Sequence, residues 1–154
     1  MNRMNKGFTL VEILIVVIIL GILAAIVIPQ FTEASSDARN SAISSDLQTL
    51  RSQCELYKFQ HNDKYPWQQT GVTNDATFWP QLLAKTNADG TTTGAPALGP
   101  YLQSKSTNPF NATAHQQDVV FGTAAVAGDG NSAWWVNTTL NKVSPDDTGG
   151  HSGM

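Results

Sequence analysis

The hydrophobic pattern divides the chain into an apolar beginning and a polar remainder. Residues 13–28 read ILIVVIILGILAAIVI without a charge, whereas residues 60–154 are rich in Asn, Thr, Gly, Ser and Asp. Between Phe8 and Ile28 the only charged residue is Glu12. A helix over this stretch, rising about 1.5 Å per residue, covers roughly the 30 Å hydrocarbon thickness of a bilayer. We therefore predict a membrane-spanning helix at residues 8–28.

Beyond Pro29 the apolar positions recur at intervals of three or four, which is typical of one face of a helix. No Gly or Pro interrupts residues 30–61, so the pattern predicts an amphipathic helical stem over residues 29–62. Pro29 itself is compatible with either a tolerated kink or a hinge. The predicted buried stripe consists of Phe31, Ala34, Ala38, Ala42, Ile43, Leu47, Leu50, Cys54 and Tyr57.

The remaining residues, 63–154, predict a small globular head. A short helix is expected near residues 76–86, and residues 119–121, 133–136 and 140–143 are typical of short strands. Turn-forming residues separate these strands, so we expect a small antiparallel sheet packed on the stem. The predicted fold class is α+β, with a long N-terminal helix that spans the membrane in its first half and is amphipathic in its second.

The residues before the apolar helix carry Arg3 and Lys6 and no acid. By the positive-inside rule, residues 1–7 stay in the cytoplasm and the head lies outside the inner membrane. A conventional secretory signal peptide is the alternative, but cleavage after Ala24 or Ala25 would place Ile22 or Leu23 where a small residue is required. The net charge of −3 gives no basic field for nucleic acid, so nucleic-acid binding is not expected.

Glu12 is unexpected in an anchor, because an intramembrane carboxylate is costly and therefore indicates a function. If the chain were cut before Phe8, the new amine would lie four residues, or one helical turn, from Glu12. Pairing of the two charges would lower the cost of both. The alternative is that the Glu12 side chain only reaches toward the membrane surface.

The run Lys6-Gly7-Phe8-Thr9-Leu10-Val11-Glu12, followed by the apolar stretch, resembles the signature of the type IV prepilin family. The resemblance implies that residues 1–7 are a leader peptide, that a prepilin peptidase cuts between Gly7 and Phe8, and that the new amine of Phe8 is methylated. From its position one turn from this amine, we further predict that Glu12 acts in filament assembly, by meeting the Phe8 amine of a neighbouring subunit.

Motifs in the head extend this resemblance to the pseudopilins, particularly the major pseudopilin of type II secretion. They are Tyr57, His61 to Pro66, Gly99-Pro100-Tyr101-Leu102, Trp134 to Asn137 and Lys142-Val143-Ser144, with Asn108-Pro109-Phe110-Asn111 standing where Asp-Pro-Trp-Gly is common. The implied function is a structural subunit of a pseudopilus that drives protein export. A pilin of a surface type IV pilus, for adhesion, motility or DNA uptake, is the alternative.

The implied partners are copies of the chain in a filament, minor pseudopilins, the prepilin peptidase, and an inner-membrane secretion platform with its ATPase. The sequence contains no P-loop and no HExxH motif, so we expect a protein that is not an enzyme. Calcium is the one cofactor that the resemblance implies. Its ligands would be Asp129, Asn131, Asp146 and Asp147, for which solvated turn residues are the alternative interpretation.

Overall fold

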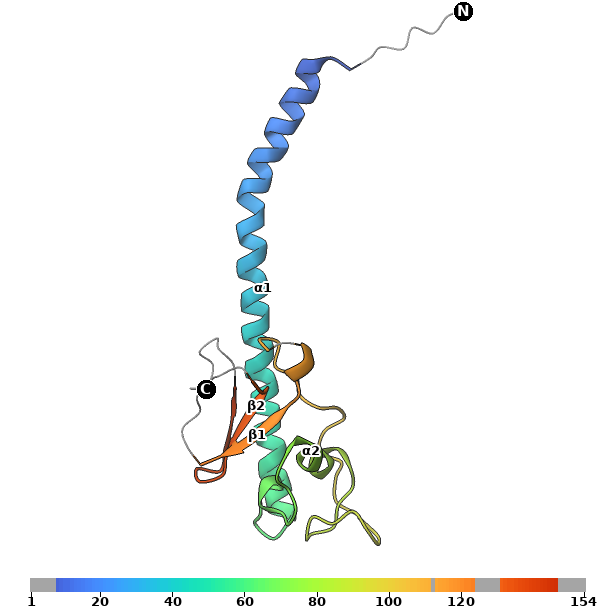
Figure 1. Cartoon of the computed structure of the whole chain (residues 1–154). Helices are drawn as coiled ribbons and strands as arrows, with labels where there is room; N and C mark the ends of the chain where they lie inside the picture. Colours follow the sequence, from blue (N-terminus) through green and yellow to red (C-terminus); the bar gives the residue numbers. More distant parts are fainter. Residues whose placement is uncertain (1–7, 112, 124–130, 147–154) are drawn as a thin grey trace, which may run out of the picture. The chain divides into compact units, whose positions relative to one another are not determined.

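The computed structural model describes residues 8–111, 113–123 and 131–146. Along the chain it contains helix α1 (Leu10–Gln60), the 3-10 turn η1 (Pro66–Gln68), helix α2 (Asp75–Leu83), the 3-10 turn η2 (Thr113–His115) and strands β1 (Val119–Gly122), β2 (Trp134–Asn137) and β3 (Lys142–Pro145) (Figure 1). The chain divides into two compact units, Met1–Ala38 and Arg39–Met154, and α1 contributes residues to both. The predicted α+β class is confirmed.

Helix α1 continues without interruption through Pro29. It ends where the sequence predicted, because Asn62 and Asp63 adopt left-handed backbone angles of φ 54° and 61°. The amide of Asp63 then donates to the carbonyl of Lys58 at 3.1 Å, which satisfies one of the carbonyls that a helix end leaves unpaired. The chain can therefore turn sharply out of α1 and begin the rest of the head.

The predicted stripe on the stem is confirmed in its second part and wrong in its first. Five of its residues are buried against the head: Ile43, Leu47, Leu50, Cys54 and Tyr57. Phe31, Ala34, Ala38 and Ala42 are exposed instead. The periodicity shows that the helix has an apolar face but does not show which residues cover that face. Head residues pack against it only from Ile43 onward, so its earlier residues stay exposed.

Helix α2 is defined by local chemistry at its first turn. The Asn74 side chain accepts a hydrogen bond from the Thr77 amide at 3.0 Å, and the Thr77 hydroxyl accepts from the Asn74 amide at 3.2 Å. These reciprocal bonds satisfy donors that would otherwise be unpaired at the helix start. The observed helix begins one residue before the predicted one and ends three residues earlier, at Leu83.

The three strands form one sheet in the order β1-β2-β3. β2 and β3 pair antiparallel, with Val136 opposite Val143, as predicted. β1 pairs parallel with β2, with Val119 opposite Trp134, so the prediction of a purely antiparallel sheet was wrong for this pair. A tight hairpin turn joins antiparallel strands only, so the parallel pairing excludes the direct turn between β1 and β2 that an antiparallel sheet would have allowed.

The core of the head is one cluster of buried apolar side chains from the stem, α2 and the sheet. Trp79 and Trp134 are its largest fully buried side chains, at 1% and 0% exposure, and each indole N–H still has a partner. Trp79 donates to the Gln117 carbonyl at 2.8 Å, and Trp134 donates to the Ser106 carbonyl at 3.1 Å. These bonds remove the cost of burying the polar edge of each ring.

Candidate functional site

The described chain begins at Phe8, two residues before α1, and its first turn is organised by Thr9 and Glu12. One carboxylate oxygen of Glu12, Oε2, accepts hydrogen bonds from the Thr9 amide at 2.8 Å and the Thr9 hydroxyl at 2.7 Å. The Thr9 hydroxyl in turn accepts from the Glu12 amide at 3.3 Å. This reciprocal arrangement is a capping box, which fixes the start of the helix at Leu10.

The capping box gives Glu12 a partner that the sequence interpretation missed. That interpretation assigned the carboxylate to an amine created at Phe8, but in the intact chain the carboxylate is bound by Thr9. The signal was present in the sequence, because Thr9-Leu10-Val11-Glu12 fits the pattern Ser/Thr-x-x-Glu that precedes helices. Gly7, the other residue of the expected cleavage site, lies outside the described residues.

The apolar part of α1 presents its large side chains outward. Every large hydrophobic residue from Phe8 to Ile28 is exposed, and most of them expose about half of their surface or more. Within the described part of the chain, α1 is the one helix that is long and apolar enough to cross a membrane. An apolar surface of this extent requires a lipid or protein environment.

The residues expected to bind calcium are only partly described. Asp129 and Asp147 lie outside the described residues, whereas Asn131 and Asp146 lie within them. Ser132, which follows Asn131, donates its hydroxyl to Oδ2 of Asp146 at 2.5 Å, and the Asp146 carboxylate is buried. The fold therefore brings the segment at Asn131 next to Asp146.

Asn111 supports the same region and was not singled out for this role by the sequence. Its side-chain amide donates to the carbonyl of Ser132, and also to the carbonyl of Asp146 at 3.1 Å. The residue is 7% exposed, so its side chain connects the segment before β2 to the segment after β3 from within the head. Among the described residues, no cluster of three or more His, Cys, Asp and Glu side chains could hold a metal ion.

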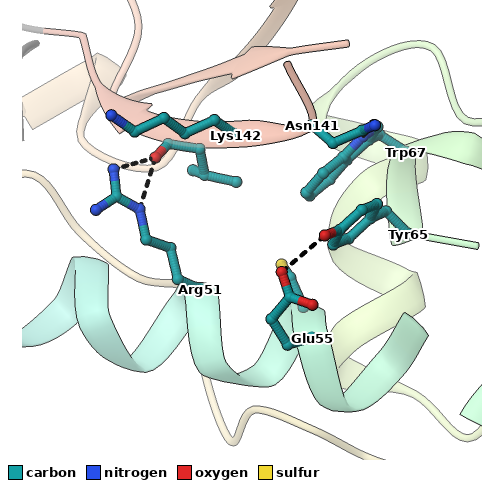
Figure 2. Close-up of a pocket in the computed structure, with 8 residues that line it drawn as sticks. Arg51, Glu55, Tyr65, Trp67, Asn141 and Lys142 are labelled. Carbon is teal, nitrogen blue, oxygen red and sulfur yellow. Dashed lines mark hydrogen bonds between the residues drawn. The ribbon is translucent and has the colours of Figure 1, made fainter. Parts of the chain in front are cut away.

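The head also contains a cavity of about 280 Å³ between the stem, η1 and the β2–β3 turn (Figure 2). Figure 2 shows Arg51 and Lys142 at one side and Tyr65, Trp67 and Asn141 at the other. Arg51 donates to the Val143 carbonyl through Nε at 3.0 Å and Nη2 at 2.7 Å. The Tyr65 hydroxyl donates to Glu55 at 2.7 Å. These contacts attach β3 and η1 to the stem.

Cys54 lines the same cavity but is only 2% exposed. Burial, together with the neighbouring charge of Glu55, raises the pKa of the Cys54 thiol well above its usual range. A thiol that stays protonated is a poor nucleophile and a poor metal ligand. The prediction that Cys54 is a buried core residue is therefore confirmed.

Comparison with known proteins gives one matching family model and several curated relatives. The family described as the prokaryotic N-terminal methylation motif matches residues 2–28. The type II secretion system core protein G of Dickeya chrysanthemi is 39% identical over 72 residues, which are 47% of this chain and 46% of that protein. Its namesake in Pseudomonas aeruginosa is 40% identical over 71 residues, covering 46% of this chain and 49% of that protein.

The type IV major pilin protein PilA of Myxococcus xanthus is 36% identical over 80 residues, or 52% of this chain and 34% of that protein. The chain thus spans about half the length or less of these curated relatives. No solved structure matches it. The predicted resemblance to the type IV prepilin and type II secretion pseudopilin family is therefore confirmed, through the methylation motif at residues 2–28 and the similarity to core protein G.

Proposed function

We propose that the chain is a structural subunit of a type II secretion pseudopilus, which assembles through its N-terminal helix to drive protein export. The observation that carries this proposal is the methylation motif at residues 2–28, together with the similarity of the chain to core protein G. The exposed apolar surface of α1 supports it, because such a surface suits both a bilayer and the interior of a helical filament. In this role the chain packs and assembles, and no catalytic step is assigned to it.

Leader processing is the first step of the proposed pathway. A prepilin peptidase would remove residues 1–7 by cutting between Gly7 and Phe8, and the new amine of Phe8 would be methylated. The start of α1 at Leu10 supports this, because Phe8 lies outside the helix and its backbone is not committed to helical hydrogen bonds. Intact-mass analysis of the membrane-purified protein should show a chain that begins at methylated Phe8. A mature chain that begins after Ala25 would contradict the proposal and indicate a conventional signal peptidase.

After processing, residues 8–28 would remain in the inner membrane with the N-terminus in the cytoplasm. The stem, residues 29–62, and the head, residues 63–154, would lie in the periplasm. Arg3 and Lys6 support this orientation through the positive-inside rule. The proposed partners are further copies of the chain, minor pseudopilins, and the inner-membrane secretion platform with its ATPase.

Assembly would depend on the carboxylate of Glu12. In the intact chain this group is bound by Thr9, so its charge is stabilised before any neighbour arrives. In a filament, the amine of Phe8 on one subunit would reach Glu12 of the next subunit. Two opposite charges in a low-dielectric surrounding attract strongly, and their pairing would set the axial register.

A surface type IV pilus is the second candidate, favoured by the similarity to the Myxococcus xanthus major pilin. Deleting the gene in its source bacterium separates the two. Loss of secreted proteins from the culture medium, with surface pili retained, is expected for a pseudopilus subunit. Loss of pili with normal secretion would overturn the primary proposal, and complementation with the intact gene controls for effects on neighbouring genes.

We also propose that the head binds calcium through Asp129, Asn131, Asp146 and Asp147. Support comes from the hydrogen bond between Ser132 and Asp146, which brings two parts of this set close together. Carboxylate and amide oxygens are the ligands that calcium prefers. The ion would link the connection before β2 to the segment after β3.

A further inference from the structure

His61 occupies an unusual position for a histidine, at the point where the stem ends. The residue is fully buried, with 0% exposure, one residue after the last residue of α1. Its ring stacks on Tyr57 at a centroid distance of 3.6 Å and an interplanar angle of 3°. Burial penalises a charged imidazole far more than a neutral one.

The hydrogen bonds of the ring assign its protonation state. Nδ1 lies 2.8 Å from the Tyr57 carbonyl, which can only accept, so Nδ1 must carry a hydrogen. Nε2 lies 2.8 Å from the Thr86 hydroxyl. In the neutral ring Nε2 has a lone pair, which accepts the hydroxyl proton of Thr86. Both nitrogens are satisfied without a charge.

The surroundings offer little compensation for a positive charge. Among the described residues no carboxylate lies within ion-pair distance of His61, in contrast to His115, whose Nδ1 is 2.7 Å from Asp118. In the part of the chain that the structure describes, three titratable groups surround the ring. They are Tyr57 on α1, Tyr101 after the loop that joins Thr86 to Leu98, and the exposed Asp89 within that loop. Burial raises the pKa of both tyrosines, so neither supplies a negative charge near neutral pH.

His61 holds one particular segment of the head. Thr86 pairs with Leu98 through two backbone hydrogen bonds of 2.9 and 3.0 Å, which close the loop between them. Besides the His61 contact, the Asn62 side chain donates to the Ala88 carbonyl at 3.3 Å, and the Tyr101 hydroxyl donates to Gln60 at 2.6 Å. The segment from Thr86 to Tyr101 is thus attached to the end of α1 by side-chain bonds, of which the His61 bond is the buried one.

We propose that His61 is an acid-sensitive latch, which holds the segment from Thr86 to Tyr101 against the end of the stem only while its imidazole is neutral. A proton added at Nε2 reverses the direction of the bond, so that the Thr86 hydroxyl must accept instead of donate, and it places a cation in a fully buried site where its charge is penalised. The inference does not depend on the chain's role in a filament. It means that the head changes at its stem end when the surrounding pH falls.

The direction of the effect follows from linkage. Burial lowers the pKa of His61 below its ordinary value of 6.5, against the opposing backbone hydrogen bonds of Tyr57 and Asn87 and the charge of Asp89. The opened state therefore binds the proton more readily than the closed state. The latch is fully stable above about pH 6.5, and its stability is lost as the pH falls through the lower pKa of the closed state.

Two measurements on the full chain in detergent micelles test the latch. The first is the NMR titration of the His61 imidazole, which should have a midpoint below 6.5. The second is hydrogen exchange at the amides of Thr86 and Leu98, corrected for the intrinsic pH dependence of exchange. Below about pH 6.5 the opening constant should rise by up to about tenfold per pH unit.

His61→Gln, which keeps a neutral polar side chain, should abolish this pH dependence. His115→Gln is the matched control, because His115 is exposed and outside the latch, and it should leave the wild-type response unchanged. Equal exchange at pH 7 and pH 5 in the wild type, or an unchanged response in His61→Gln, would overturn the proposal. If that variant does not fold, the wild-type titration still decides, since a midpoint at or above 6.5 contradicts a neutral latch.

Discussion

At the scale of single residues, two of the chain's few charged groups have defined partners. Glu12 shows this in the apolar half of α1, where its carboxylate accepts two hydrogen bonds from Thr9. Arg51 shows it in the head, where its guanidinium donates twice to the carbonyl of Val143. The contact between Glu12 and Thr9 stabilises the start of a helix, and the contact between Arg51 and Val143 connects segments that are distant in sequence.

Two substitutions of Glu12 separate its proposed roles. Glu12→Gln keeps the capping-box chemistry with Thr9 but removes the charge, whereas Glu12→Ala removes both. If pairing with the Phe8 amine drives assembly, both variants should be inserted and cleaved normally, yet filament yield and secretion should fall at least tenfold. Glu33→Ala, at an exposed acid further along α1, is the control. Wild-type assembly by Glu12→Gln would show that capping is sufficient and the charge dispensable.

Arg51→Met should destabilise the head by about 1.5 to 3 kcal/mol, the usual range for a lost hydrogen bond to a charged group. The Val143 carbonyl loses two donors, and methionine replaces most of the apolar length of the side chain without replacing them. Urea unfolding followed by tryptophan fluorescence measures the change. The matched control is Arg39→Met, an exposed arginine of the same helix, which should stay within about 0.5 kcal/mol of the wild type.

At the scale of elements, the sequence predicted the helices and strands that are specified by a local pattern of residues. The long helix followed from apolar length and then from periodicity, and its end followed from His61-Asn62-Asp63, where positive φ angles stop it. β1, β2 and β3 were found within two residues at either end, because runs such as Trp134-Trp135-Val136 favour strands.

The pairing of the strands was less accessible from sequence. The parallel direction of β1 relative to β2 is a long-range property of the sheet, about which short-range turn signals say nothing. The contacts of Arg51 and His61 with Val143 and Thr86 were also missed, because their partners lie 92 and 25 residues away. Contacts between residues so far apart in the sequence leave no periodic pattern in it, so they cannot be predicted in this way.

The β1–β2 pair has a specific steric requirement at Gly122. A Cβ atom placed there would lie 2.4 Å from Cζ2 of Trp135, whereas the glycine leaves room for the indole ring. Gly122→Ala should therefore displace Trp135 and destabilise the sheet by about 1 to 3 kcal/mol, as overpacking usually does. Faster hydrogen exchange at the Thr138 amide, which donates to the Gly122 carbonyl, would locate the damage. Val120→Ala, on an exposed position of the same strand, should have a smaller effect.

At the scale of the whole molecule, the two units described by the structure have different physical characters. Residues of the first unit expose apolar side chains along α1, whereas the second unit buries apolar and aromatic side chains, among them Trp79 and Trp134, in one core. The first therefore needs an environment of lipid or other subunits, and the second can fold around its own stem. This division supports the proposal that the same chain is first a membrane protein and then part of a filament.

Calcium should raise the stability of the folded head if the proposed ligands bind it, because an ion that binds only the folded state stabilises it by mass action. At a free ion concentration about 100 times the dissociation constant, the gain is about 2.7 kcal/mol, which corresponds to a rise of several degrees in Tm. Calorimetry of the full chain in micelles, with chelator and then with millimolar calcium, measures this shift.

Magnesium at the same concentration controls for charge screening, since its smaller, more rigid coordination shell fits a flexible carboxylate loop poorly. Asp147→Asn should reduce the shift while leaving the buried bond between Ser132 and Asp146 in place. Equal melting temperatures with chelator and calcium would exclude the site, and the four residues would then be ordinary turn and packing residues.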